Sequence, residues 1–360
     1  MKRFFAILLC VIMVFAIVAC DTADKQDETN KNDAAKTEAS YKLGMGVVVS
    51  MDSSKTGLAQ VDATVATVVT DADGKIVACR IDVAQNKMDV TDGAVDTAKT
   101  FETKMELGSR YGMAGKVDNN DDGVMLEWDA QTKAFEAYVV GMTAADVKAI
   151  KTQEAKGHLI AVDEKLLAAG CSMQITDFVA AVAAACEDEQ GMSFKTAEKF
   201  TLGVAAKTSA ADSVAATAEA NGTVAMYTDF AATVVVDGKI VAALNDAIQP
   251  KITIDAAGEI VEKAYNKTKR NLKEDYNMAK FGGSMDWNGD GKVLEWYIQS
   301  EAFSKHVVGM TAANVEAMAT QVVEGAGYVI SADKALLDAG CTIQITAIKA
   351  VMAQAVKNAR

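Results

Sequence analysis

An acidic segment in the first half of the chain has the residue types and the spacing of a calcium-binding loop. The run Asp118-Asn-Asn120-Asp-Asp122-Gly123 places oxygen-bearing side chains at positions 1, 3 and 5 and a glycine at position 6. Such oxygens can converge on a hard cation, while the glycine permits the sharp turn between them. Position 7, which contributes a backbone carbonyl in such loops, is Val124. The spacing therefore predicts a calcium site in this loop.

A second segment, Asp286-Trp-Asn288-Gly-Asp290-Gly291, repeats this pattern with Lys292 at position 7. Position 12, a bidentate glutamate in calcium loops, is Asp129 in the first segment and Tyr297 in the second. We therefore expect the first loop to bind calcium better, with Glu295 as the substitute ligand in the second. The alternative interpretation is a pair of Asn/Asp/Gly turns that hold no ion.

The N-terminal segment has the layout of a secretory signal peptide. Lys2 and Arg3 precede an uncharged apolar run that ends in Ile17-Val-Ala-Cys20. The run is too short for a membrane-spanning helix, which needs about 20 residues. Its end resembles the bacterial lipobox, in which the cysteine becomes acylated. We therefore predict a lipoprotein signal peptide over residues 1–19 and lipid attachment, such as palmitate, at Cys20.

Residues 20–40 and the overall charge suit a protein held outside the membrane. The segment that follows Cys20 has no aromatic and no large aliphatic side chain, so we expect a disordered tether. The formal net charge of -13 argues against a nucleic-acid partner, which requires a basic face. With only His158 and His306 in the chain, a multi-histidine zinc centre is excluded. We expect a lipid-anchored protein on the extracytoplasmic face of the cell membrane.

The rest of the chain consists of two copies of one sequence unit. Segments recur in the same order at a nearly constant offset: Asp73-Gly-Lys-Ile-Val-Ala and Asp237-Gly-Lys-Ile-Val-Ala, Leu126-Glu-Trp and Leu294-Glu-Trp, Val139-Val-Gly-Met-Thr-Ala-Ala and Val307-Val-Gly-Met-Thr-Ala-Ala. The period is too long for a solenoid. We predict two tandem homologous domains, over residues 41–190 and 198–358.

Each repeat begins with strands and ends with helices. Ala63 to Val83 and Ala231 to Leu244 read as hairpins that turn at Asp-Gly dipeptides. Apolar residues at helical spacing follow Trp128 and Trp296, and Thr143 opens a further segment that resembles a capping box. The order predicts an α+β fold in which each domain is an antiparallel sheet with packed helices.

Each repeat resembles the FMN-binding domain lipoproteins of anaerobic Firmicutes, which are similar to the flavin-carrying component of sodium-pumping NADH:quinone reductases. The resemblance rests on Tyr111-Gly-Met, Glu127-Trp-Asp-Ala-Gln131 and Gly170-Cys-Ser-Met-Gln-Ile-Thr-Asp-Phe178, in this order and at similar spacing. It implies that a late hydroxyl carries FMN through a phosphoester bond. On this chain the hydroxyls are those of Ser172 and Thr342.

The late segment departs from the family pattern Ser-Gly-Ala-Ser/Thr. It reads Ala169-Gly-Cys-Ser172 in the first repeat and Ala339-Gly-Cys-Thr342 in the second, and the family's upstream acidic residue falls on Leu166 and Leu336. We therefore expect degenerate domains with at best weak, non-covalent flavin binding.

The resemblance and these departures together favour a non-catalytic binding lipoprotein, whose small-molecule or protein partner the sequence does not reveal. Two alternatives stay open. One is a flavin-carrying extracytoplasmic electron-transfer protein. The other is a calcium-stabilised structural or adhesive surface module.

Overall fold

The main strands of the two repeats form two antiparallel sheets in a computed structural model that describes residues 37–280, 286, 287, 289, 291–325 and 327–360. The first sheet has the order β3-β2-β1-β6 and the second has the order β10-β9-β7. Their bounds are β1 (Ala39–Ser50), β2 (Leu58–Thr70), β3 (Ile76–Asp89), β6 (Met192–Thr196), β7 (Thr201–Ser209), β9 (Tyr227–Val236) and β10 (Lys239–Ile248). Both predicted hairpins are confirmed, as β2–β3 and β9–β10.

The helices and the short strands follow the main strands in the same order in both repeats, which confirms the α+β class. The first repeat has η1 (Thr91–Gly93), α1 (Lys104–Leu107), η2 (Gly108–Tyr111), α2 (Trp128–Tyr138), α3 (Ala144–Lys148), β4 (Thr152–Ala155), β5 (His158–Ala161), α4 (Glu164–Ala168) and α5 (Thr176–Cys186). The second has α6 (Lys269–Leu272), η3 (Lys273–Tyr276), α7 (Trp296–His306), α8 (Ala312–Glu316), β13 (Thr320–Val322), β14 (Val329–Ser331), α9 (Lys334–Asp338) and α10 (Thr346–Lys357). As predicted, Thr143 caps α3 reciprocally with Asp146.

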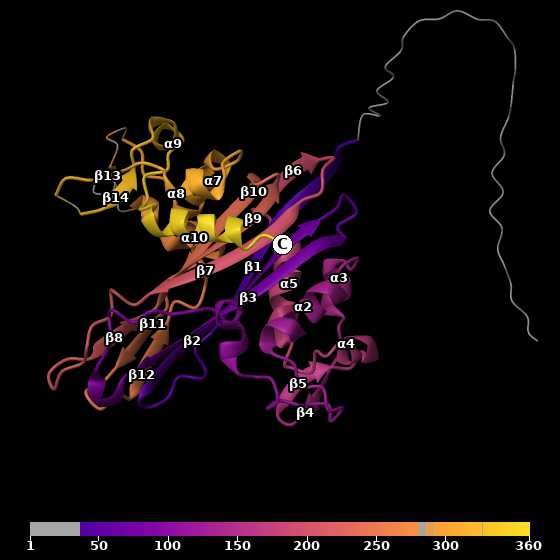
Figure 1. The fold of residues 1–360 in the computed structure, drawn as a ribbon. Coiled ribbons are helices and arrows are strands. Elements are labelled where there is room, and N and C mark those ends of the chain that lie inside the picture. Colours follow the sequence, from indigo (N-terminus) through magenta and orange to yellow (C-terminus); the bar gives the residue numbers. More distant parts are fainter. Residues whose placement is uncertain (1–36, 281–285, 288, 290, 326) are drawn as a thin grey trace, which may run out of the picture. The chain divides into compact units, whose positions relative to one another are not determined.

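Side chains from both repeats fill one core between the two sheets. Val61 and Val65 on one face of β2 belong to the same apolar cluster as Phe230 and Val234 on β9. The opposite face of β2, including Val68, packs with the helices of its own repeat. Figure 1 shows the helices of the two repeats on opposite sides of the strands. Residues 38–360 are thus one compact unit, in which each repeat covers an apolar face of the other.

The glycine in the recurring Leu-Gly pair lets a helix pack directly on the first strand of each repeat. A Cβ atom on Gly44 of β1 would lie 1.9 Å from the carbonyl oxygen of Ala185 in α5. A Cβ on Gly203 of β7 would lie 1.9 Å from the carbonyl oxygen of Ala355 in α10. Because such a contact is a steric clash, only glycine permits this close approach.

The hairpin of the second repeat is interrupted where that of the first is continuous. Pro250 follows β10 and lacks the N–H that a continuing ladder needs. The strands β11 (Lys251–Ile254) and β12 (Ile260–Ala264), which follow Pro250, and β8 (Gly222–Ala225), which precedes β9, form a separate sheet of order β12-β11-β8. The sequence did not predict this third sheet.

Two predicted boundaries need correction. Residues 39 and 40, assigned to the tether, belong to β1, because Ala39 pairs with Thr196 and Ser40 with Lys195. The segment between the predicted domains contains β6, which is a strand of the first sheet. The predicted signal peptide and the tether to residue 36 lie outside the described residues.

Candidate functional site

A buried aspartate on the second strand of each main hairpin, β2–β3 or β9–β10, holds the short helix that follows it. Asp82 on β3 accepts a hydrogen bond from the backbone N–H of Met105 in α1 at 3.1 Å. Asp246 on β10 accepts one from Arg270 in α6, also at 3.1 Å. Burial raises the pKa of Asp82 to about 6 and also raises the pKa of Asp246. These bonds place the lysine that begins each helix, Lys104 or Lys269, beside the sheet.

Lys269 lies among three aromatic rings. Its Nζ atom is 4.7 Å from the ring centroids of Tyr227 and Tyr276 and 5.2 Å from that of Trp296. It also donates a hydrogen bond to the hydroxyl of Tyr227 at 2.5 Å. The residue is only 5% exposed. The rings come from β9, η3 and α7, so this lysine cage (Tyr227, Tyr276, Trp296 and Lys269) is assembled only in the folded chain.

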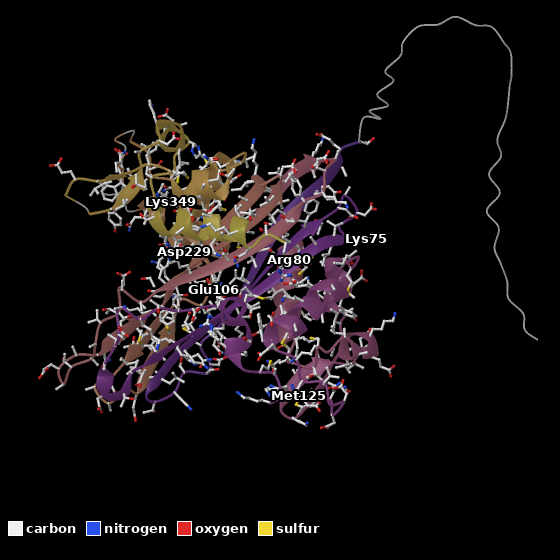
Figure 2. All side chains as sticks on the ribbon, viewed as in Figure 1. Lys75, Arg80, Glu106, Met125, Asp229 and Lys349 are labelled. Carbon is white, nitrogen blue, oxygen red and sulfur yellow. The ribbon has the colours of Figure 1, made fainter. Side chains whose placement is uncertain are left out.

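Asp229 supplies negative charge near this cation. It lies on β9, and Figure 2 labels it among the strands of the second repeat. Burial raises the pKa of Asp229 to about 7, an effect that the charge of Lys269 opposes. Burial lowers the pKa of Lys269 to about 8, an effect that Asp229 opposes. Both groups are therefore close to changing protonation state near neutral pH.

A cavity of about 650 Å³ adjoins the lysine cage. Its volume is in the range of small-molecule sites, about 300–1,000 Å³. Its lining combines aromatic and apolar residues with lysines, and includes Tyr227, Tyr265, Lys269, Leu272, Tyr276 and Met278. Tyr265, at the cavity, is 65% exposed and has a left-handed backbone with a φ of 61°. Such strain in a residue other than glycine is found preferentially at functional sites.

The first repeat has a related but more open arrangement. Lys104 Nζ lies 4.9 Å from the ring centroid of Tyr111 and 5.4 Å from that of Trp128. The registers of the two hairpins align Asp62 with Tyr227, so this repeat lacks the third ring. Lys104 is half-buried. The first repeat therefore has part of the cage, with an acid in place of a phenol.

The two residues expected to carry flavin are buried, and a glutamine side chain accepts a hydrogen bond from the backbone N–H of each. The backbone N–H of Ser172 donates to Gln131 Oε1 at 3.0 Å, and that of Thr342 donates to Gln299 Oε1 at 2.8 Å. Ser172 is 2% exposed and Thr342 is 5% exposed. The recurring glutamine thus satisfies the backbone of the late segment. The burial of both hydroxyls disfavours access by an attaching enzyme.

The recurring glutamate before each tryptophan has a similar backbone role. Glu127 accepts a hydrogen bond from the backbone N–H of Met113 at 3.0 Å. Glu295 accepts from Met278 at 2.9 Å and from Ala279 at 3.1 Å. These bonds connect the Tyr-x-Met segment to the start of the following helix. Both Glu295 oxygens thus accept backbone hydrogen bonds, although we predicted this residue as a calcium ligand.

The first predicted calcium loop is closed by its own hydrogen bonds. The carboxylate of Asp118 accepts from the backbone N–H of Asp122 at 3.2 Å and of Gly123 at 3.0 Å. Asp122 accepts from the N–H of Val124 at 2.7 Å and from the side-chain amide of Asn120 at 2.7 Å. The structure therefore brings the side chains of positions 1, 3 and 5 into one turn.

Two lysines engage groups in and after this loop. Lys156 Nζ donates to Asp121 at 2.6 Å and to the backbone carbonyl of Asp118. Asp129, the predicted ligand at position 12, lies in α2 and forms an ion pair with Lys133 at 2.7 Å. A bound cation would have to compete with these lysines.

In the second predicted loop, Asp286 accepts a hydrogen bond from the backbone N–H of Gly291 at 2.9 Å, as Asp118 does in the first. Lys292 is exposed, whereas Asn288 and Asp290 lie outside the described residues. Over the ranges that the structure describes, no cluster of three or more His, Cys, Asp or Glu side chains is placed to hold a metal ion.

The predicted lipid-attachment residue, Cys20, also lies outside the described residues. Among the helices that the structure does describe, none has both the length and the apolar character needed to cross a membrane.

The lysine cage was not predicted from the sequence. A signal was present, because Thr103-Lys104 precedes Tyr111 at the same spacing as Thr268-Lys269 precedes Tyr276. That spacing shows which residues the repeats share. It does not reveal Tyr227, which reaches Lys269 from a strand.

Comparisons with protein-family models, with curated proteins and with solved structures found no match to this chain.

Proposed function

We propose that the protein is a lipid-anchored, non-catalytic binding protein of the extracytoplasmic face, and that its ligand occupies the cavity beside Lys269. The observation that carries the proposal is this cavity of about 650 Å³, whose lining includes Tyr265, Leu272 and Met278 together with Tyr227, Lys269 and Tyr276 of the lysine cage. Apolar walls with a few convergent polar groups are the usual composition of a small-molecule site. The lipobox that ends at Cys20 supports the location.

The flavin-carrying alternative has less support. Ser172 and Thr342 are buried, and Thr342 Oγ1 is within 3.2 Å of Gln299 Oε1. The cysteines that precede them, Cys171 and Cys341, are fully buried, and burial raises the pKa of each to about 12. These segments therefore fit the role of packed core better than that of a cofactor attachment site.

A cavity-filling substitution tests the binding site. Leu272→Trp should fill the cavity, and the matched control is Leu107→Trp, at the corresponding position of α1. A library of small aromatic and aliphatic compounds would be screened against the full-length protein by ligand-observed NMR. We expect compounds whose signals respond to the wild type and to Leu107→Trp but not to Leu272→Trp. If no compound distinguishes the two variants, the cavity is not the binding site.

The anchor is tested separately. Cys20→Ala should abolish the incorporation of labelled palmitate in a bacterial host and release the protein from the membrane fraction. Undiminished labelling of that variant would contradict the proposed lipid attachment.

A further inference from the structure

Lys269 combines two properties that surface lysines lack. Its amine is surrounded by the rings of Tyr227, Tyr276 and Trp296 at 4.7 to 5.2 Å from their centroids. The residue is also among those that line the cavity of about 650 Å³. Its Nζ atom donates a hydrogen bond to the hydroxyl of Tyr227 at 2.5 Å. This amine is thus largely removed from water and adjoins a space in which a ligand fits.

The charges around the amine do not fully offset its burial. Asp229 and Asp246 both favour the protonated lysine, but desolvation is the larger effect and lowers the pKa of Lys269 to about 8. Asp246 already accepts the backbone N–H of Arg270. The neutral fraction of this amine near neutral pH is therefore larger than that of a lysine with an unperturbed pKa. A neutral amine in an apolar pocket is a nucleophile toward carbonyl carbon.

We propose that the ligand of this cavity is a small aldehyde with an apolar or aromatic body, and that Lys269 holds it as an imine. The inference rests on the proposed function, because it assigns a ligand class to the same cavity. Tyr265, Leu272 and Met278 would contact the body of the ligand, and the amine would react with its carbonyl group. The protein remains a binding protein, since the imine is a reversible bond to the ligand.

The reaction balances without an oxidant or a reductant. The lone pair of neutral Lys269 Nζ attacks the carbonyl carbon, and a proton moves from nitrogen to the former carbonyl oxygen. The resulting hydroxyl group leaves as water, taking the second amine proton, and a C=N bond replaces the C=O bond. The hydroxyl of Tyr227, hydrogen-bonded to Nζ, is positioned to relay one of these protons. Burial raises the pKa of Tyr227 well above its ordinary value, so the phenol keeps its proton.

The chain provides two internal reference lysines. Lys104 occupies the corresponding position in the first repeat, half-buried between two rings. Lys267 also lines the cavity but is exposed. If only proximity to the cavity mattered, Lys267 would react as well as Lys269. If the neighbouring tyrosine and tryptophan alone determined reactivity, Lys104 would react as well as Lys269.

The test uses the full-length protein with benzaldehyde at pH 7.5, and borohydride to reduce any imine to a stable amine. Peptide mass spectrometry then gives the rate of modification at each lysine. We expect Lys269 to be modified at least about tenfold faster than Lys104 and Lys267, because its lowered pKa gives it a larger fraction of neutral amine. Lys269→Arg should abolish this fast modification, whereas Lys104→Arg should leave it unchanged.

Lys269 modified no faster than Lys104 or Lys267 in the wild type would overturn the proposal, whether or not Lys269→Arg folds. Benzyl alcohol, which has the same ring but no electrophilic carbon, separates this failure from that of the proposed function. If benzyl alcohol binds the wild type and not Leu272→Trp while Lys269 stays unmodified, the cavity binds ligands but not as an imine. If fast modification of Lys269 persists in Leu272→Trp, the reaction does not take place in the cavity, and the proposal is wrong.

Discussion

The lysines that begin α1 and α6 occupy corresponding positions in the two repeats, but the side chains around them differ. Lys104 and Lys269 each follow a capping threonine, and each lies over a tyrosine and a tryptophan. The difference comes from the neighbouring strand, where Asp62 of the first repeat aligns with Tyr227 of the second. One phenol therefore completes a cage around Lys269, whereas Lys104 stays half-buried. A repeat can thus keep its scaffold while one strand position changes the site.

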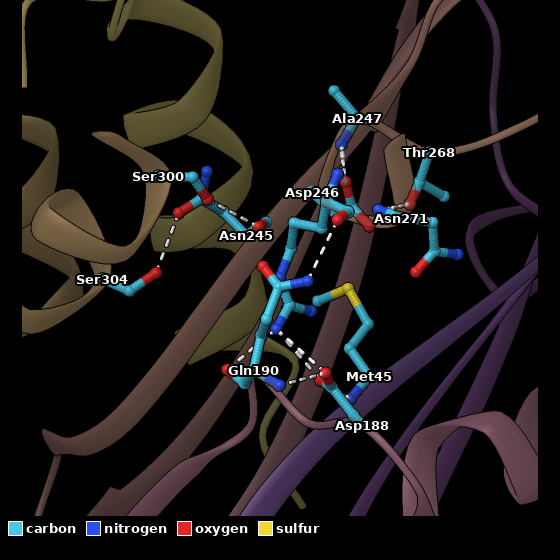
Figure 3. A network of polar contacts seen from close by, with 11 residues as sticks. Met45, Asp188, Gln190, Asn245, Asp246, Ala247, Thr268, Asn271, Ser300 and Ser304 are labelled. Carbon is cyan, nitrogen blue, oxygen red and sulfur yellow. Dashed lines mark hydrogen bonds and ion pairs between the residues drawn. The ribbon is translucent and has the colours of Figure 1, made fainter. Parts of the chain in front are cut away.

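The residue after each lysine differs in a way that joins the repeats. Met105 in the first repeat corresponds to Arg270 in the second, which forms an ion pair with Asp188 at 3.0 Å. Both side chains are nearly buried, at 6% and 8% exposure. Asp188 also accepts the backbone N–H of Met45 in β1, and Arg270 donates to the carbonyl oxygen of Gln190 (Figure 3). This network connects the end of the first repeat to α6 of the second.

The largest effect is therefore expected from Arg270→Met, which gives the second repeat the residue of the first. The substitution leaves Asp188 buried without its partner, so we expect a loss of about 3–5 kcal/mol in the free energy of unfolding. Urea unfolding followed by circular dichroism measures it. In a double-mutant cycle, Asp188→Asn should recover part of the loss. A loss below about 1 kcal/mol would show that the pair behaves like a surface ion pair.

The next largest effect concerns how the buried aspartates Asp82 and Asp246 make the free energy of unfolding depend on pH. The pKa of Asp82 in the folded protein, about 6, lies above the ordinary aspartate value of 3.8. Its contribution to stability is therefore fully present below pH 3.8 and is lost as the pH rises through 6. For a shift of this size the loss is about 3 kcal/mol.

Asp82→Asn should remove that loss, because asparagine is neutral at every pH and keeps an oxygen for Met105. We expect the variant to gain about 3 kcal/mol relative to the wild type between pH 4 and pH 7, as measured by urea unfolding. Asp246→Asn should change in the same direction, because burial also raises the pKa of Asp246. Parallel pH profiles for wild type and Asp82→Asn would contradict the prediction.

A smaller effect separates the two lysines directly. Lys269→Met removes the cation whose charge lowers the pKa of Asp229, so we expect a loss of about 1–3 kcal/mol at pH 8, where Asp229 is mostly ionised. Lys104→Met acts on a half-buried side chain and should cost less than about 1 kcal/mol. Thermal and urea unfolding of both variants check the order. Equal losses would mean that the third ring does not distinguish the sites.

The smallest effect is expected from calcium. The first loop already closes through hydrogen bonds to Asp118, and Lys156 occupies oxygen atoms beside it. At a few-fold excess over Kd, calcium bound only to the folded state adds about 1 kcal/mol. Millimolar calcium should thus raise Tm slightly, and Asp118→Ala should reduce that rise more than Asp286→Ala does. Identical melting curves with calcium and with chelator would reject a calcium site.

Features that depend on local signals were predictable from the sequence alone. The Asp237-Gly238 turn is one, because both residues have positive φ, at 48° and 75°, which this dipeptide tolerates. The cap at Thr143 and the buried face of Trp128 and Phe135 follow from spacing within one segment. The repeat itself showed that the two halves share these elements.

Only the tertiary structure determines which residues of different helices and strands contact each other. Lys269 and Tyr227 come from different elements far apart in the chain, and their contact depends on strand register and on the packing of α6. The core that the two repeats share was also not predictable from the sequence. Val65 and Val68 are both fully buried, although they lie on opposite faces of one strand. Alternating small and apolar residues do not reveal that a second sheet covers the other face. Contacts between distant segments carry no local pattern, so burial, pairing and the cavity beside Lys269 emerge only on folding.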